Sequence, residues 1–132
     1  MQRKPGGYRQ PTEKQRELSK IPKEEFRDWC QQTWTLTGAS TREHPAPYPF
    51  ELANRLVRMF SFVGDTVLDP FAGSGTTQLA AAKNGRNSIG VEIYPAYCQL
   101  ARKRLEGELE SLFGETRLRF EIPAENQTSA AA

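Results

Sequence analysis

The chain has 132 residues, of which 37% are hydrophobic and 26% are charged, with a net charge of +2. This composition fits one small, polar globular domain with a thin core, and the charge is too small to indicate nucleic-acid binding by itself. No apolar run approaches the ~20 residues of a membrane helix, and the polar start predicts no secretory signal. Cys30 and Cys98 stand alone, without metal-type or disulfide-type spacing, so we expect a cytoplasmic protein without a metal site.

Residues 1–40 are predicted to be a basic, largely extended arm and linker. Residues 1–28 hold eight Lys and Arg against five Asp and Glu, whereas the remainder holds ten against eleven. Glycine and proline interrupt this stretch and apolar residues are few. The basic excess could meet phosphate, but a solvated arm of mixed charge explains it equally well.

A proline-rich loop follows at residues 44–49, His-Pro-Ala-Pro-Tyr-Pro. Three prolines in five positions exclude a regular helix or a central strand. We therefore expect a stiff, extended loop, which is suited to holding a ligand.

From Pro49 onward the pattern becomes regular. Apolar residues recur at helical spacing up to Phe60. The expected elements after this helix are a buried strand at 66–69, a helix from Thr76 to Asn84 that Gly85 stops, a strand at 88–93, a helix opened by Pro95, and a possible third strand at 118–122. Strand, glycine-rich turn, helix and strand form a βαβ unit, so the predicted fold class is α/β with a parallel sheet. The polar, alanine-rich tail at 124–132 is predicted to be disordered.

The glycine-rich turn could hold one of three kinds of ligand. A triphosphate loop is excluded because Gly75-Thr76-Thr77 contains no lysine. A dinucleotide turn is disfavoured because Gln78 replaces the third small residue, and the Asp69 carboxylate would repel a pyrophosphate. S-adenosylmethionine reverses this electrostatic preference, since it carries a sulfonium and an amino group but no phosphate.

A second acidic residue supports that interpretation. Glu92 follows Asp69 by 23 residues, at the end of the next predicted strand. An acidic residue at this place commonly binds ribose hydroxyls. Ile93 comes directly after it and could contact adenine, although core packing explains an isoleucine equally well.

Together the proline loop, the turn Asp69-Pro70-Phe71-Ala72-Gly73-Ser74-Gly75-Thr76-Thr77 and Gly90-Val91-Glu92 resemble bacterial DNA methyltransferases that act on exocyclic amino groups. The resemblance is to the subclass with a permuted motif order, in which the target-base half precedes the cofactor half. Several of its members belong to restriction-modification systems. The resemblance implies a partial Rossmann-like, S-adenosylmethionine-dependent fold with an incomplete parallel sheet, spanning residues 41–123.

The resemblance also implies roles for individual residues. The proline loop and Asp69 would hold the methionine end of S-adenosylmethionine, and Glu92 would bind its ribose. The His44 side chain is expected to be structural. The complete set of expected cofactor-binding residues is His44, Pro45, Ala46, Pro47, Asp69, Pro70, Phe71, Ala72, Gly73, Ser74, Gly75, Thr76, Glu92 and Ile93.

The motif that orients the flipped target base in this family, Asp- or Ser-Pro-Pro-Tyr or -Phe, does not occur. None of the nine prolines follows another proline, and Asp69-Pro70-Phe71 belongs to the turn. We therefore expect no catalytic residue in this chain, no methylation by the chain alone, and a partner chain that supplies the catalytic and target-recognition segments. DNA would be bound through the complete enzyme.

Two other interpretations stay open from the residues alone. The chain could be a non-catalytic remnant that binds the cofactor, or the cofactor half of an enzyme that methylates RNA or protein. The sequence does not distinguish a split subunit from a gene fragment or a truncated sequence.

Overall fold

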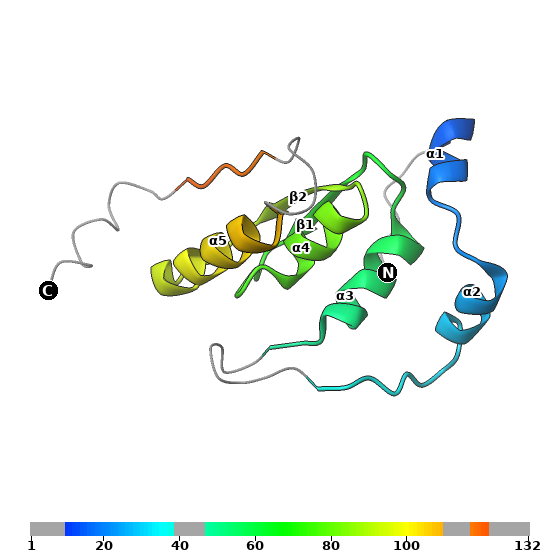
Figure 1. Ribbon diagram of the computed structural model, residues 1–132, viewed down its shortest axis with the longest axis horizontal. Coiled ribbons are helices and arrows are strands. Elements are labelled where there is room, and N and C mark those ends of the chain that lie inside the picture. The colour runs from blue at the N-terminus through cyan, green and yellow to red at the C-terminus, as the bar shows by residue number, and fades with distance from the viewer. Residues whose placement is uncertain (1–9, 39–46, 110–116, 122–132) are drawn as a thin grey trace, which may run out of the picture.

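A computed structural model describes residues 10–38, 47–109 and 117–121. The elements in chain order are the helices and strands α1 (Glu13–Leu18), α2 (Lys23–Trp29), α3 (Phe50–Phe60), β1 (Thr66–Asp69), α4 (Thr76–Lys83), β2 (Asn87–Gly90) and α5 (Pro95–Leu109). In Figure 1, α5, α4 and α3 follow one another across the molecule, and α1 and α2 lie beyond α3. Nowhere in these ranges is a helix long and apolar enough to cross a membrane.

The two strands confirm the predicted parallel βαβ unit. Thr66 lies opposite Asn87 and Asp69 opposite Gly90, with α4 as the connection. The second strand was predicted to reach Ile93 but ends at Gly90. It is shorter because its partner strand ends at Asp69, after which the chain enters the glycine-rich turn.

The predicted third strand is wrong for the residues that can be described. Residues 117–121 form no strand, and Ile122 lies outside the described residues. Alternating apolar residues form a strand only when a neighbouring strand is available for pairing. Phe120 instead packs beside α5, where the Arg102 guanidinium lies 5.4 Å from its ring centre.

Helix α4 is the centre of the core. Its Leu79, Ala80 and Ala81 are almost completely buried. Ala80 contributes to a cluster with residues of α3, and Leu79 to a second cluster with residues of α5. The small alanine side chains let neighbouring elements approach closely, so α4 joins α3, α5 and both strands.

The sheet is covered by described residues on one face only. Val67 points to this covered face and packs against the cluster formed by α3 and α4. Leu68 and Ile89 are register partners, and they remain 64% and 55% exposed. Parallel sheets are normally covered on both faces.

The prediction of a largely extended arm at residues 1–40 needs correction, because α1 and α2 lie within it. Thr12 caps α1 with a reciprocal pair of hydrogen bonds to Gln15, and Pro22 stands just before α2, where proline is tolerated. The Gln15 Nε2 atom donates to the Val63 carbonyl at 2.9 Å, which ties α1 to the core. These tertiary contacts outweigh a locally weak helix signal.

A cation–π cluster attaches α2 to α3. Trp29 is buried, and the guanidinium of Arg58 lies 4.7 Å from its ring centre. Arg58 also pairs with Glu25 at 2.9 Å. Arg55 lies 5.3 Å from the ring centre of Trp34, whose indole N–H donates to the Trp29 carbonyl. The basic and aromatic residues of this region therefore serve packing in the described structure.

An ion pair between α4 and α5 gives a first prediction. The hydrogen bond from Lys83 Nζ to Glu108 Oε2, at 2.7 Å, holds the pKa of Glu108 below its ordinary value of 4.5. A carboxyl with a lowered pKa stabilises the fold above its unfolded-state pKa, and this contribution is lost as the pH falls through its folded-state pKa. Glu108→Gln should therefore lower stability slightly at pH 7, by less than about 1 kcal/mol because the pair is partly exposed. The two proteins should become equally stable at about pH 2, where the Glu108 carboxyl is protonated in the folded and the unfolded chain. Urea unfolding of both proteins at the two pH values measures this, and a difference that persists in acid would contradict it.

Candidate functional site

The glycine-rich turn joins β1 to α4. Gly73 and Gly75 have φ angles of 51° and 76°, which lie in the left-handed region that favours glycine. Gly75 is also the N-cap of α4. A Cβ atom on Gly75 would lie 3.2 Å from the Ala101 Cβ atom of α5, so backbone conformation and helix packing both require glycine here.

Glu92 connects the end of β2 to this turn. Its Oε2 atom accepts from the Gly73 N–H at 2.8 Å, and its Oε1 atom accepts from the Tyr94 N–H at 2.9 Å. Each carboxylate oxygen has a further lone pair, so the group can still accept from a ligand hydroxyl. Glu92 therefore shapes the turn while it keeps capacity for a ligand.

Asp69 lies at the end of β1. Its Oδ1 atom accepts from the Phe71 N–H at 3.0 Å, and its backbone carbonyl accepts from the Val91 N–H at 2.9 Å. The parallel register thus brings the two predicted acidic residues to the same edge of the sheet, one on each side of the turn. This edge, at the carboxyl ends of the strands, is where open α/β sheets bind ligands.

The remaining predicted residues divide into three groups. Ala72, Gly73, Gly75 and Thr76 are buried parts of the turn, and Ser74 is half-buried. Phe71 and Ile93 are 85% and 78% exposed, so Ile93 is not a core residue. Pro47 is half-buried, whereas His44, Pro45 and Ala46 lie outside the described residues.

Arg104 of α5 is a site residue that the sequence interpretation missed. Its Nη1 atom donates to the Thr76 hydroxyl at 2.9 Å and lies within 3.4 Å of the Ser74 carbonyl and hydroxyl oxygens. The turn itself contains no basic residue, but this helix brings one against it. A signal was present, because Arg104 adjoins Leu105, a residue of the predicted apolar stripe of α5. Glu108 accepts from Arg104 at 3.5 Å and offsets part of its charge.

Tyr48 lies within the predicted proline loop, although it is not among the individual residues expected to bind the cofactor. It directly follows Pro47, and its hydroxyl is hydrogen-bonded to the hydroxyl of Thr77 on α4. Burial raises the pKa of Tyr48 above its ordinary value of 10.0, the Thr77 hydrogen bond opposes this, and the nearby Asp69 carboxylate adds to the rise. The hydroxyl thus stays protonated at neutral pH.

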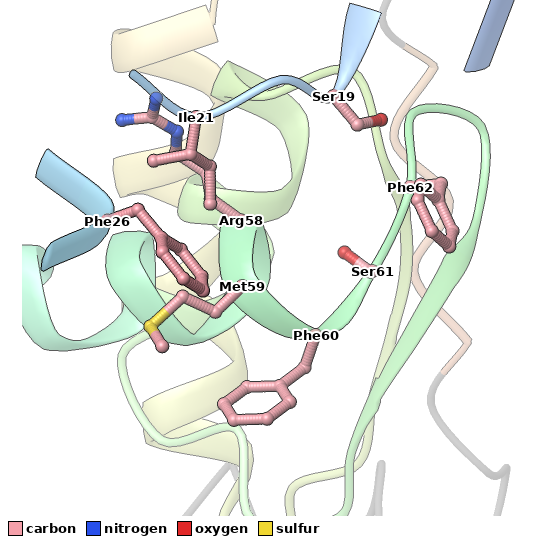
Figure 2. A pocket seen from close by; sticks show the side chains of 8 residues that line it. All are labelled: Ser19, Ile21, Phe26, Arg58, Met59, Phe60, Ser61 and Phe62. Carbon is pink, nitrogen blue, oxygen red and sulfur yellow. The ribbon is translucent and has the colours of Figure 1, made fainter. Parts of the chain in front are cut away.

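Two hollows lie beside α3, and the second reaches Thr77 at the end of the turn. One, of about 410 Å³, is formed by the connection between α1 and α2 and by the end of α3, and Figure 2 shows Phe26, Met59 and Phe60 along it. The other, of about 320 Å³, lies between α3 and β1 and is lined by Leu56, Val57 and Thr66 among others. Neither is lined by Asp69 or Glu92.

A parallel βαβ unit with a glycine turn after its first strand defines an α/β protein, with two acidic residues at the carboxyl ends of its strands. The chain belongs to the N6/N4 DNA methylase family, whose profile matches residues 3–103. This confirms the predicted family at that level.

Among curated relatives, the chain is 44% identical over 119 residues to the type II methyltransferase M.MthZI of Methanothermobacter thermautotrophicus, covering 82% of this chain and 34% of the relative. It is 47% identical over 89 residues to the type II methyltransferase M.MjaI of Methanocaldococcus jannaschii, covering 63% and 29%. The chain thus spans about a third of the length of these relatives.

Among solved structures, the chain resembles TTHA0409 of Thermus thermophilus, with a TM-score of 0.73 and 55% identity over 83% of this chain and 45% of that one. A structure of TTHA0409 in complex with S-adenosyl-L-methionine matches with a TM-score of 0.70 and 55% identity, covering 83% and 42%. The α/β fold with a small parallel sheet therefore corresponds to part of a larger structure.

Proposed function

We propose that the chain is the S-adenosylmethionine-binding portion of a site-specific DNA methyltransferase that modifies the N6 atom of adenine or the N4 atom of cytosine. The observation that carries this proposal is the pair of carboxylates, Asp69 and Glu92, held by backbone N–H groups on either side of a glycine turn. The complex of TTHA0409 with S-adenosyl-L-methionine supports it, because that protein is 55% identical over the matched region.

The donor set fits this cofactor. Asp69 offers negative charge to a sulfonium or an amino group, and Glu92 offers free lone pairs to ribose hydroxyls. The turn itself contains no basic side chain to hold phosphate. Arg104 lies against the turn, but its Nη1 atom already donates to Ser74 and Thr76. When bound, the cofactor supplies an electrophilic methyl group, whereas the residues of this chain bind and orient it.

Methyl transfer further requires groups that accept the hydrogens of the target amino group and stack on the flipped base. No Pro-Pro pair occurs in the sequence to provide them. We infer that a second chain carries the catalytic and target-recognition segments, and that DNA is bound by the assembled enzyme.

Exposed apolar surface supports the need for such a partner. Leu68 and Ile89 form a bare patch on one face of the sheet, and Phe60 is 68% exposed beside the hollow between α3 and β1. Patches of this kind on small proteins commonly mark an interface. The partner is expected to cover this face.

Calorimetric titration tests the cofactor. We expect the chain to bind S-adenosylmethionine and its thioether product, and to bind ATP and NAD at least about tenfold more weakly, because Asp69 disfavours phosphate. Asp69→Asn keeps the acceptor for the Phe71 N–H but removes the charge. It should therefore weaken the binding of S-adenosylmethionine, which carries the sulfonium, more than the binding of its thioether product. Binding of ATP or NAD without S-adenosylmethionine would refute the proposal.

Complementation tests the enzyme. The chain is mixed with the product of a neighbouring gene that encodes Ser- or Asp-Pro-Pro-Tyr, and transfer of labelled methyl groups to DNA is measured. We expect transfer only from the mixture. Cofactor binding without transfer in any such mixture would instead identify a non-catalytic remnant, and transfer to RNA or protein would identify another acceptor.

A further inference from the structure

The first turn of α4 is held from two sides. Successive residues of a helix point about 100° apart. Thr76 is bonded to Arg104 of α5, and the next residue, Thr77, is bonded to Tyr48 of the segment that enters α3. The start of α4 is also the end of the glycine turn, so both contacts fix the site as well as the helix.

The hydrogen bond between Tyr48 and Thr77 joins the segment that enters α3 to the first turn of α4, across 29 residues of the chain. Tyr48 lies between Pro47 and Pro49, whose rings restrict the backbone on both sides. Its ring packs on the core cluster of α3 and α4, and its hydroxyl reaches Thr77. The Tyr48 side chain therefore ties the segment that enters α3 to the first turn of α4.

We propose that Tyr48 is a positioning residue of the cofactor site, whose hydroxyl bond to Thr77 fixes the segment Pro47–Pro49 beside the start of α4, near the Asp69 carboxylate that would bind the methionine end of the ligand. This inference rests on the proposed cofactor. The proximity of Asp69 supports it, because Asp69 contributes to the electrostatic environment of the Tyr48 hydroxyl.

The same pair of helices supplies a matched control. Away from the turn, the Asn84 amide donates to Asn54 Oδ1 at 2.9 Å, which ties α4 to α3 by a second polar contact. Asn54→Ala removes this contact without touching the turn. It reports what the loss of one hydrogen bond between α3 and α4 does to stability alone.

The experiment measures dissociation constants for S-adenosylhomocysteine and for 5′-methylthioadenosine, which lacks the amino-acid part, together with the melting temperature. Tyr48→Phe keeps the ring and Thr77→Val keeps the shape of the side chain, and each removes one hydroxyl. Each substitution should weaken the binding of S-adenosylhomocysteine roughly three- to tenfold, as expected for one hydrogen bond. The affinity for methylthioadenosine should stay within about twofold of the wild-type value. The double variant should bind S-adenosylhomocysteine no more weakly than whichever single variant binds it less tightly.

Asn54→Ala should lower the melting temperature without changing either dissociation constant. If Tyr48→Phe and Thr77→Val behave in the same way, the hydroxyl bond is merely structural and the inference is overturned. An equal loss of affinity for both ligands also overturns the inference, because the effect would not be confined to the methionine end. A wild-type chain that binds neither ligand rejects the proposed cofactor itself, and this inference with it.

Discussion

Glu92→Gln is expected to weaken binding of S-adenosylmethionine by roughly 100-fold while the chain remains folded. Glu92 accepts hydrogen bonds from the Gly73 and Tyr94 backbone N–H groups with its two carboxylate oxygens. Glutamine has only one oxygen, so its amide nitrogen would face one of these N–H groups. A hydrogen bond to a charged group contributes about 1.5–3 kcal/mol, and the substitution also removes an acceptor for the ribose.

The comparison needs a variant with the same change of charge elsewhere. Glu106 forms an exposed ion pair with Arg102 on α5, so Glu106→Gln should bind the cofactor like the wild type. Calorimetry measures the affinities, and circular dichroism measures the helix content of each variant. Wild-type affinity in Glu92→Gln would remove Glu92 from the proposed site.

Gly90→Ala is expected to destabilise the fold by about 1–3 kcal/mol, because it overfills the space between β2 and α4. A Cβ atom at this position would lie 2.6 Å from Gln78 Nε2 and 3.0 Å from the Ala72 Cβ atom. The Gln78 side chain is buried, and neither of its polar atoms has a hydrogen-bond partner among the described residues. The Gln78 amide must therefore shift, whereas the Ala72 Cβ atom is fixed to the backbone and has little freedom to give way.

A second substitution should reverse the effect. Gln78→Ala in the Gly90→Ala background removes the clash and the buried amide, so the double variant should recover most of the lost stability. Gly107→Ala is the matched control, since nothing lies within 4 Å of a Cβ atom there and alanine favours the interior of α5 by about 0.5–1 kcal/mol. Urea unfolding measures five proteins: the wild type, Gly90→Ala, Gln78→Ala, the double variant and Gly107→Ala. Additive losses in the double variant would show that Gly90 and Gln78 do not compete for space.

Local patterns predicted the central part of the fold well. Strand β1 has the predicted bounds, and α4 ends at Lys83, with Gly85 in the left-handed conformation that terminates it. Pro95 is the first residue of α5, as its fixed φ angle indicates. In each case the signal was a residue whose own backbone preference determines the structure.

Errors occurred where distant contacts decide. The arm contains α1 and α2 because Gln15 and Ser19 bond to Val63, 48 and 44 residues away. The stretch at 118–122 carries a strand pattern, but no strand forms at 117–121 because pairing needs a neighbour that the pattern itself does not supply.

Short-range backbone preferences and fixed spacing were sufficient to predict the βαβ unit, the glycine turn and the two acidic residues near the ends of the strands. The resemblance of these motifs to known DNA methyltransferases predicted the family. The folded chain was needed to show that Arg104 and Tyr48 hold the turn from opposite sides, and that Gln78 lies over Gly90. These contacts join residues that are 12 to 30 positions apart. They follow from helix packing, which brings together side chains that lie far apart in the chain.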